Sequence, residues 1–140
     1  MYKKPTDNNF IQGILTPSHT LGCIIKLSGN TYKKMNGFPN NLWGWGREDD
    51  IFQKRAKYYN IKFDRFIIRG RNNYKIYFKE FGDHDRDKSN LGNNIKADHH
   101  FGKSKTKEED IKNNGLTTLN YKLKKESTIN NYIKHIVVDI

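Results

Sequence analysis

The sequence predicts an α/β fold in a single domain. Its 140 residues fit one domain of ordinary size. Short apolar runs bounded by turn-forming residues, as in strands, alternate with segments whose apolar residues recur at helical spacing. The hydrophobic fraction of 34% with 13% aromatic residues excludes a simple disordered tail.

The N-terminal region predicts an irregular arm, then a strand and a short helix. Residues 1–19 are polar, and two prolines and several other turn formers interrupt them. Residues 22–27 are apolar and end at a turn-forming Ser-Gly-Asn, as expected of a buried strand. A short helix over residues 31–35 would be capped by Ser28 or Asn30.

A loop and a second helix are expected next. Residues 36–47 are rich in Gly, Asn and Trp and have no apolar period, which indicates a loop. Residues 48–59 predict a helix, because apolar residues recur there at a spacing of 3.6. Three acidic residues begin this helix, where the positive end of the helix dipole favours them.

The middle of the chain predicts two strands and a long loop. Residues 61–68 and 74–81 are β-prone runs around a turn-forming segment, so they form a hairpin or a pair of strands. Residues 82–105 are charged and contain Gly, Asn and His, which indicates a loop.

The C-terminal part predicts one helix and two further strands. Thr106 and Glu109 form a capping-box pattern, and Gly115 stands where a helix would end, so we expect a helix over about residues 107–114. Residues 116–123 and 132–140 follow as strands, the last of them strongly apolar.

Charge and targeting patterns narrow the function without identifying it. The formal net charge is +11, but Lys and Arg are spread from Lys3 to Lys134 instead of being concentrated on one motif. Codon bias explains much of this excess, so nucleic acid is not an expected partner. The single Cys23 excludes an internal disulfide framework and a cysteine-based zinc cluster. We find no signal peptide and no apolar run near the ~20 residues of a membrane anchor, which makes the cytoplasm the default expectation.

Residues 36–52, NGFPNNLWGWGREDDIF, hold the side chains suited to chemistry. Trp43 and Trp45, separated by one glycine, make a poor helix and a poor strand interior. An aromatic surface beside carboxylates suits sugar binding, and a carboxylate can deprotonate a hydroxyl as a general base. The alternative interpretation is an acidic helix start next to two Trp in a hydrophobic cluster. We also expect Trp45 to be exposed and mobile and Trp43 to pack against the domain.

This segment resembles the motif of the β-1,4-galactosyltransferase family, N-G-F-P-N-N-aromatic-W-G-W-G-G/R-E-D-D. The variant with Arg47 is similar to the branch that acts on xylosyl residues of proteoglycan linkers. Other segments that match in the family's order are residues 22–28, 84–88, 106–108, 115–121 and 137–140. The resemblance covers residues 20–140, so the expected organisation is an arm over 1–19 and a galactosyltransferase-like domain over 20–140.

The resemblance implies a role for each motif residue. Asp49 would be the catalytic base of an inverting transfer from a UDP-sugar donor to a glycan acceptor. Trp45 would close over the donor, and Glu48 would contact donor hydroxyls. The acceptor-binding set would be Arg47, Glu48, Asp49 and Asp50.

The resemblance also implies a Mn²⁺ cofactor, with His84 as a ligand. Here the chain departs from the family, because no D-x-D motif stands upstream of the Trp segment and the position of a methionine ligand is Phe81. Thr20 stands where an aromatic residue helps to set donor choice. Residues 97–104, expected to shape the acceptor's N-acetyl pocket, have little similarity to the family.

The implied architecture is a partial GT-A-like glycosyltransferase fold. We expect the C-terminal, acceptor-side half and no N-terminal nucleotide-binding half. The function expected is therefore a β-1,4-galactosyltransferase-like enzyme whose donor-binding half comes from elsewhere, such as a second chain with the D-x-D motif. A non-catalytic carbohydrate-binding remnant is the alternative.

Overall fold

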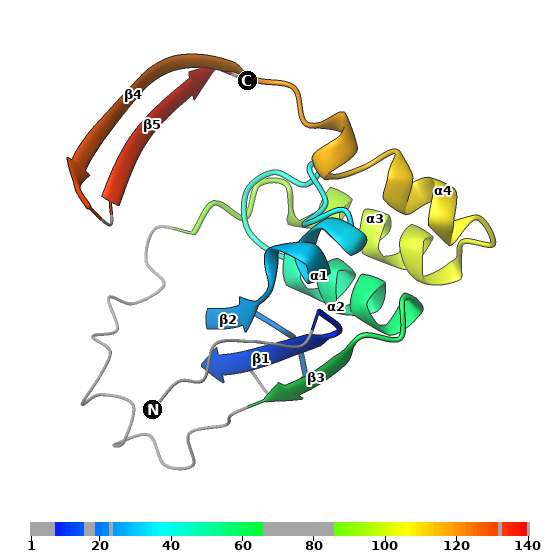
Figure 1. The fold of residues 1–140 in the computed structure, drawn as a ribbon. Coiled ribbons are helices and arrows are strands. Elements are labelled where there is room, and N and C mark those ends of the chain that lie inside the picture. The colour runs from blue at the N-terminus through cyan, green and yellow to red at the C-terminus, as the bar shows by residue number, and fades with distance from the viewer. Residues whose placement is uncertain (1–7, 16–18, 23, 66–85, 132, 140) are drawn as a thin grey trace, which may run out of the picture.

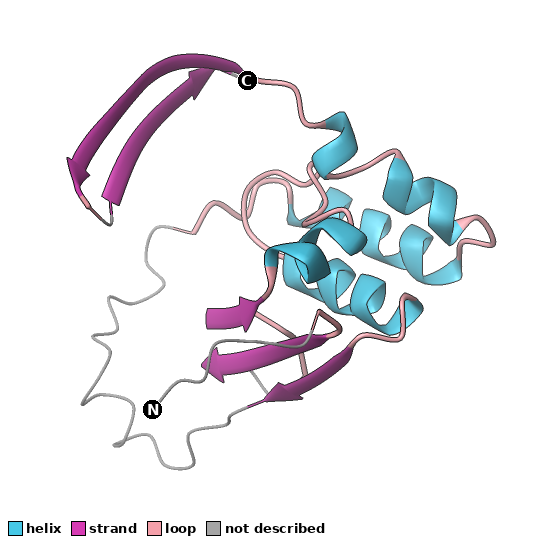
Figure 2. Ribbon diagram, in the orientation of Figure 1, coloured by secondary structure: helices cyan, strands magenta, loops and turns pink. Residues whose placement is uncertain are grey.

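A computed structural model describes residues 8–15, 19–22, 24–65, 86–131 and 133–139. In chain order the elements are β1 (Phe10–Leu15), β2 (Ile24–Leu27), α1 (Gly29–Lys34), α2 (Glu48–Tyr58), β3 (Lys62–Arg65), α3 (Leu91–Lys103), α4 (Lys107–Lys112), the 3-10 helix η2 (Leu116–Thr118), β4 (Lys122–Asn130) and β5 (Ile133–Asp139). Helices and strands are mixed, as the sequence predicts (Figure 2). No helix in these ranges is long and apolar enough to cross a membrane.

A small mixed sheet lies on one side of the helices (Figure 1). Its strand order is β2-β1-β3, with β1 antiparallel to β2 and parallel to β3. The central strand β1 lies within the stretch where the sequence predicts an irregular arm. Its Ile11 is fully buried, which explains why six residues near two prolines still form a strand.

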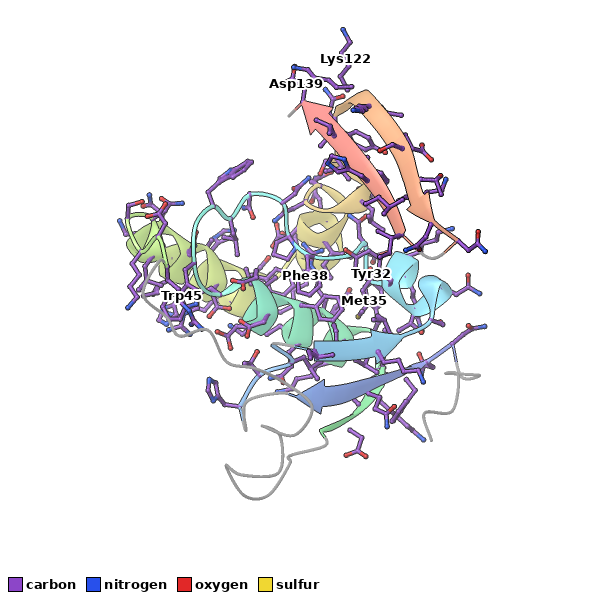
Figure 3. All side chains as sticks on the ribbon, turned by 90° about the vertical axis from the view of Figure 1, so that its left-hand side faces the viewer. Tyr32, Met35, Phe38, Trp45, Lys122 and Asp139 are labelled. Carbon is purple, nitrogen blue, oxygen red and sulfur yellow. The ribbon has the colours of Figure 1, made fainter. Side chains whose placement is uncertain are left out.

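Helix α2 packs on this sheet and forms the main core. Phe52 and Ala56 are fully buried with Ile11 and Met35. Phe38 stacks on Phe52 at a centroid distance of 4.1 Å, so the aromatic end of the core lies beneath the loop that precedes α2 (Figure 3). The helix predicted over residues 48–59 is confirmed as α2. Its regularly spaced apolar residues form the face that packs against the sheet.

Two further helices cover the other side of α2, and one of them corrects a prediction. Residues 82–105 were expected to be a loop, but Leu91–Lys103 forms α3. Phe101 of α3 packs with Ile51 and with Ile111 of α4 in a second buried cluster. These tertiary contacts stabilise a helix whose own sequence has little helix propensity.

The predicted helix near residue 107 is confirmed as α4, and Ser28 is the cap of α1, where its side chain accepts a hydrogen bond from the Thr31 N–H. The prediction of a strand from residue 116 is wrong, because Leu116–Thr118 forms η2. The predicted strand over residues 74–81 lies outside the described residues.

The β4–β5 hairpin extends away from the helices (Figure 1). Its strands pair antiparallel with each other, and both faces are open to solvent along most of their length. Ile136 and Ile129 are 54% and 66% exposed. The terminal strand is therefore present as predicted, but its apolar side chains are not buried.

Candidate functional site

The loop between α1 and α2, residues 36–47, is shaped by left-handed backbone conformations. Gly37, Gly44 and Gly46 have positive φ angles of 66°, 71° and 106°. Arg47, directly before α2, has φ 79°, which a residue with a β-carbon rarely adopts. Such outliers persist where surrounding structure fixes them, and they concentrate at functional sites.

The start of this loop is fastened to the region after α4. Asn36 donates from Nδ2 to the carbonyl of Ile111 at 2.6 Å and accepts at Oδ1 from the Thr117 N–H at 2.9 Å. The Leu116 N–H bonds to the Asn36 carbonyl at 3.0 Å. The Asn-Gly pair of the motif is therefore structural, because it joins two segments that lie far apart in sequence.

Arg55 of α2 reinforces the same junction from inside. It is fully buried, and its guanidinium donates to the carbonyls of Gly37, Asn36 and Asn114 at 2.8, 3.2 and 2.5 Å. Burial lowers the pKa of Arg55 to about 10, so the group keeps its charge at neutral pH. These hydrogen bonds fix the backbone at the start of the loop.

The two Trp side chains differ from the prediction in one respect. Trp45 is 38% exposed, as expected, but Trp43 is 59% exposed, so the prediction that Trp43 packs against the domain is wrong. Two cations lie over the Trp45 ring, with Arg86 Cζ at 5.1 Å and Lys88 Nζ at 5.4 Å from its centroid. Cation–π contacts of this kind stabilise an exposed aromatic ring by ~0.5–1 kcal/mol.

A cavity of about 750 Å³ opens between this loop, the start of α2 and α3. Its lining residues are His19, Thr20, Trp45, Gly46, Arg47, Glu48, Asp49, Asp50, Arg86, Leu91 and Ile95. The structure thus brings together all of the motif residues that the sequence proposed for donor and acceptor. It combines an aromatic and aliphatic wall with carboxylates and cations, a suitable lining for a sugar.

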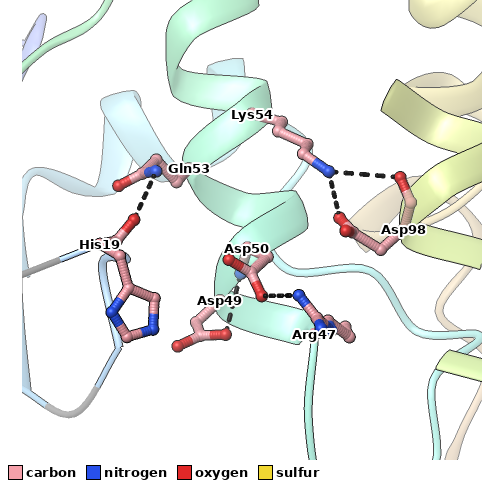
Figure 4. A network of polar contacts seen from close by, with 7 residues as sticks. All are labelled: His19, Arg47, Asp49, Asp50, Gln53, Lys54 and Asp98. Carbon is pink, nitrogen blue, oxygen red and sulfur yellow. Dashed lines mark hydrogen bonds and ion pairs between the residues drawn. The ribbon is translucent and has the colours of Figure 1, made fainter. Parts of the chain in front are cut away.

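Asp49 and Asp50 have different surroundings within the cavity. Asp49 Oδ1 accepts the backbone N–H of Asp50 at 2.9 Å, while its other oxygen, Oδ2, lies against Gly22 so closely that a β-carbon there would collide with it. Asp50 instead pairs with Arg47, with 3.2 Å between Oδ2 and Nη1 (Figure 4). Among the described residues, Asp50 therefore has a cationic partner, whereas Asp49 forms no ion pair.

The segment beside Asp49 adds His19 and Thr20 to the cavity. No role was assigned to His19 from the sequence, and the resemblance linked Thr20 only to donor choice. The His19 carbonyl accepts Gln53 Nε2 at 3.1 Å, which fixes the segment to α2, and the His19 side chain lies on the same side of α2 as Asp49 (Figure 4). Thr20 is only 3% exposed, and its Oγ1 has no hydrogen-bond partner among the described residues. A buried hydroxyl at a cavity wall is suited to a ligand's polar group.

The metal prediction is not supported by a cluster in the described part of the chain. In those ranges no group of three or more His, Cys, Asp or Glu side chains could hold a metal ion. His84 lies outside the described residues, so its predicted role stays a prediction. The described residues do not by themselves form a Mn²⁺ site.

The role of residues 97–104 in an N-acetyl pocket of the acceptor stays a prediction, and three of these residues line a second cavity. Ala97, His100 and Phe101 border a second cavity of about 460 Å³ with Ile51 and Asp110. The α3 side chains in the Asp49 cavity are Leu91 and Ile95, which sequence reasoning assigned to a loop. The buried positions of this helix include the polar residues Asn94 and Asp98, so the apolar period that predicts a helix is weak here.

Comparison with known proteins finds similarity to galactosyltransferases. A family model described as the N-terminal domain of galactosyltransferase matches residues 12–80. Beta-1,4-galactosyltransferase 2 of Cricetulus griseus is 34% identical over 103 residues, which are 73% of this chain and 25% of that protein. Beta-1,4-galactosyltransferase 3 of Homo sapiens is 40% identical over 58 residues, 41% of this chain and 14% of that protein.

The chain belongs to the β-1,4-galactosyltransferase family. It spans a quarter or less of the length of these family members, so their whole activity is not transferred to it by the match. The matching family model is described as an N-terminal domain, whereas the order of motifs led us to expect the C-terminal half. The assignment of this family member to one half of a GT-A-like fold therefore stays a proposal.

Proposed function

We propose that this galactosyltransferase-family chain binds a sugar acceptor and activates its hydroxyl for an inverting transfer of a hexose from a UDP-sugar. The observation that supports this most directly is the environment of the Asp49 carboxylate. One of its oxygens accepts the Asp50 N–H, and the Asp49 carboxylate forms no ion pair with a cation in the part of the chain that the structure describes. A carboxylate in this setting is suited to general-base catalysis.

In the proposed reaction, Asp49 accepts the proton of the acceptor hydroxyl. The hydroxyl oxygen forms its bond to the anomeric carbon of the donor sugar as the bond from that carbon to UDP breaks. The electron pair of that bond leaves with UDP, and the configuration at the carbon inverts. Trp45 and the side chains of Leu91 and Ile95 would contact the apolar faces of the sugars.

Neighbouring residues would orient the acceptor. Asp50, Glu48 and Arg47 provide hydrogen-bond acceptors and donors at the same wall. Thr20 also lines the cavity, and its hydroxyl has no partner among the described residues. Arg47 and Asp50 already hold each other in place, so their side chains are pre-arranged for binding.

A donor-binding half belongs to the proposal, either from a second chain or from further sequence of the same protein. The family resemblance assigns the D-x-D motif and the nucleotide contacts to that half. Mn²⁺, when bound there with His84, would neutralise the charge of the donor diphosphate.

The test compares Asp49→Asn with Asp50→Asn. Turnover is measured with UDP-galactose, Mn²⁺ and methyl β-xyloside, with and without a chain that contains the donor-binding half. Asp49→Asn should lower kcat by about 10²–10⁴-fold, because the base is lost while the side-chain shape is kept. Asp50→Asn should mainly raise the acceptor KM.

Melting temperatures of both variants serve as the control for folding. Unchanged turnover in Asp49→Asn would overturn the assignment of the base and leave the acid with a helix-dipole role of ~0.3–1 kcal/mol. If the xyloside quenches Trp45 fluorescence but no mixture shows turnover, the result would contradict the proposed catalytic function. It would favour the alternative of a non-catalytic carbohydrate-binding protein.

A further inference from the structure

One buried side chain of α3 holds the backbone of the two Trp residues. Asn94 is 1% exposed, and its Nδ2 donates to the carbonyl of Trp43 at 3.0 Å and to that of Trp45 at 3.4 Å. A primary amide has two N–H donors, so both are used here. The Oδ1 of Asn94 accepts from Asn90 Nδ2 at 3.4 Å, which fixes the orientation of the amide.

The residues just before α3 bond to the same Trp segment as well. The Trp45 N–H donates to the Asp87 carbonyl at 2.8 Å, and Gly44 lies so close that an added β-carbon would be 3.0 Å from that carbonyl. Trp45 therefore has both backbone polar groups bonded to the segment that leads into and forms α3. These bonds fix the position of the Trp45 backbone at the edge of the cavity.

We propose that Asn94 is a positioning residue that sets Trp45 at the wall of the Asp49 cavity and so couples α3 to sugar binding. The functional part of this inference rests on the proposed function. The structural part, that Asn94 determines where Trp45 lies, can be measured without any ligand.

The amide is the chemical group that this position requires. An aspartate would point carboxylate oxygens at two carbonyls. An alanine would remove the amide donor from the Trp45 carbonyl and leave the Trp43 carbonyl with the Asn90 amide at 3.4 Å. The loop can then turn these partly buried carbonyls towards water, which supplies new donors. Loss of the amide should therefore release the loop and leave the core, which lies around α2, in place.

The experiment uses Trp43→Phe as background, because Trp45 is then the single tryptophan of a chain with two. Emission maximum and acrylamide quenching are compared for Asn94→Ala, Asn94→Asp and the control His99→Ala. His99 is exposed on the same helix, and its side chain has no hydrogen bond among the described residues. The two Asn94 variants should shift emission to the red and raise the quenching constant about twofold, as for a released ring that is 38% exposed when held.

Unchanged emission and quenching in Asn94→Ala, with helical circular dichroism intact, would overturn the proposal. Where that variant loses its circular dichroism, Asn94→Gln decides, since it keeps both donors on a longer side chain. A quenching constant of Asn94→Gln that lies between the constants of the background protein and of Asn94→Asp supports positioning by the amide. A quenching constant of Asn94→Gln equal to that of Asn94→Asp contradicts it. In an active preparation, Asn94→Ala should raise the acceptor KM more than it lowers kcat. Because the fluorescence test needs no sugar, its failure and the failure of the proposed function are separate results.

Discussion

Helix α2 and the β4–β5 hairpin have similar apolar residues but opposite surroundings. Ile51 of α2 is 2% exposed, whereas Ile136 of β5 is 54% exposed. The helix is covered by the sheet on one side and by α3 and α4 on the other. A two-stranded hairpin with solvent on both faces is marginally stable by itself. An apolar pattern therefore predicts that an element forms, while its burial depends on surfaces elsewhere in the chain.

The largest effect expected from this comparison is at Arg55, the centre of the buried region. Arg55→Ala should lower the free energy of unfolding by roughly 3–5 kcal/mol, because it leaves several buried carbonyls without donors and opens a cavity. Urea denaturation measures this value. Arg55→Lys keeps the charge but not the fork of donors, so it should fall between alanine and wild type. A loss below about 1 kcal/mol in the alanine variant would contradict the structural role of the guanidinium.

A matched pair of isoleucines tests the comparison itself. Ile51→Ala should cost about 2–4 kcal/mol of unfolding free energy, since it removes buried methylenes and leaves a cavity. Ile136→Ala should cost less than about 0.5 kcal/mol, as for other exposed positions. Both values come from the same thermal or urea unfolding curves. Equal losses at the two positions would show that a further surface covers the hairpin in solution.

The smallest effect concerns the strained residue at the start of α2. At position 47, glycine should be more stable than alanine by ~1 kcal/mol, because only glycine adopts the left-handed conformation without cost. Both variants lose the ion pair with Asp50, so that contribution cancels. At the exposed Lys57 of the same helix the order should reverse, with alanine better by ~1 kcal/mol. The same order at both positions would mean that Arg47 is not strained.

Local sequence signals predicted the elements whose residues determine them directly. The period of apolar residues predicted α2, and Ser28 was one of the two expected caps of α1. Helix α3 was missed because it contains Gly, Asn and His, which have low helix propensity, and because contacts with other elements stabilise it. One of these contacts is the ion pair between Lys54 of α2 and Asp98, with 2.5 Å between Nζ and Oδ1. Strand β1 was missed because its neighbours in the sheet, not its own flanks, define it.

The site was predicted where it is contiguous in sequence. Residues 45–50 line one cavity because a tight loop and the first turn of a helix keep them together. Asn94 could not be found from the motif, since its contacts cross about fifty positions of sequence. The exposure of Trp43 was predicted wrongly for the same reason, because the packing of this loop is determined by α3.

The contact between Gly22 and Asp49 has a consequence for how the site can change over many generations. Oδ2 of Asp49 fills the space where any other residue at position 22 would have its β-carbon. Any replacement of Gly22 therefore requires the Asp49 carboxylate to turn away from this position, which changes the direction of the proposed base without any change at position 49. A smaller residue at position 49 would leave that space open. The side chains that position 22 tolerates therefore depend on the residue at position 49.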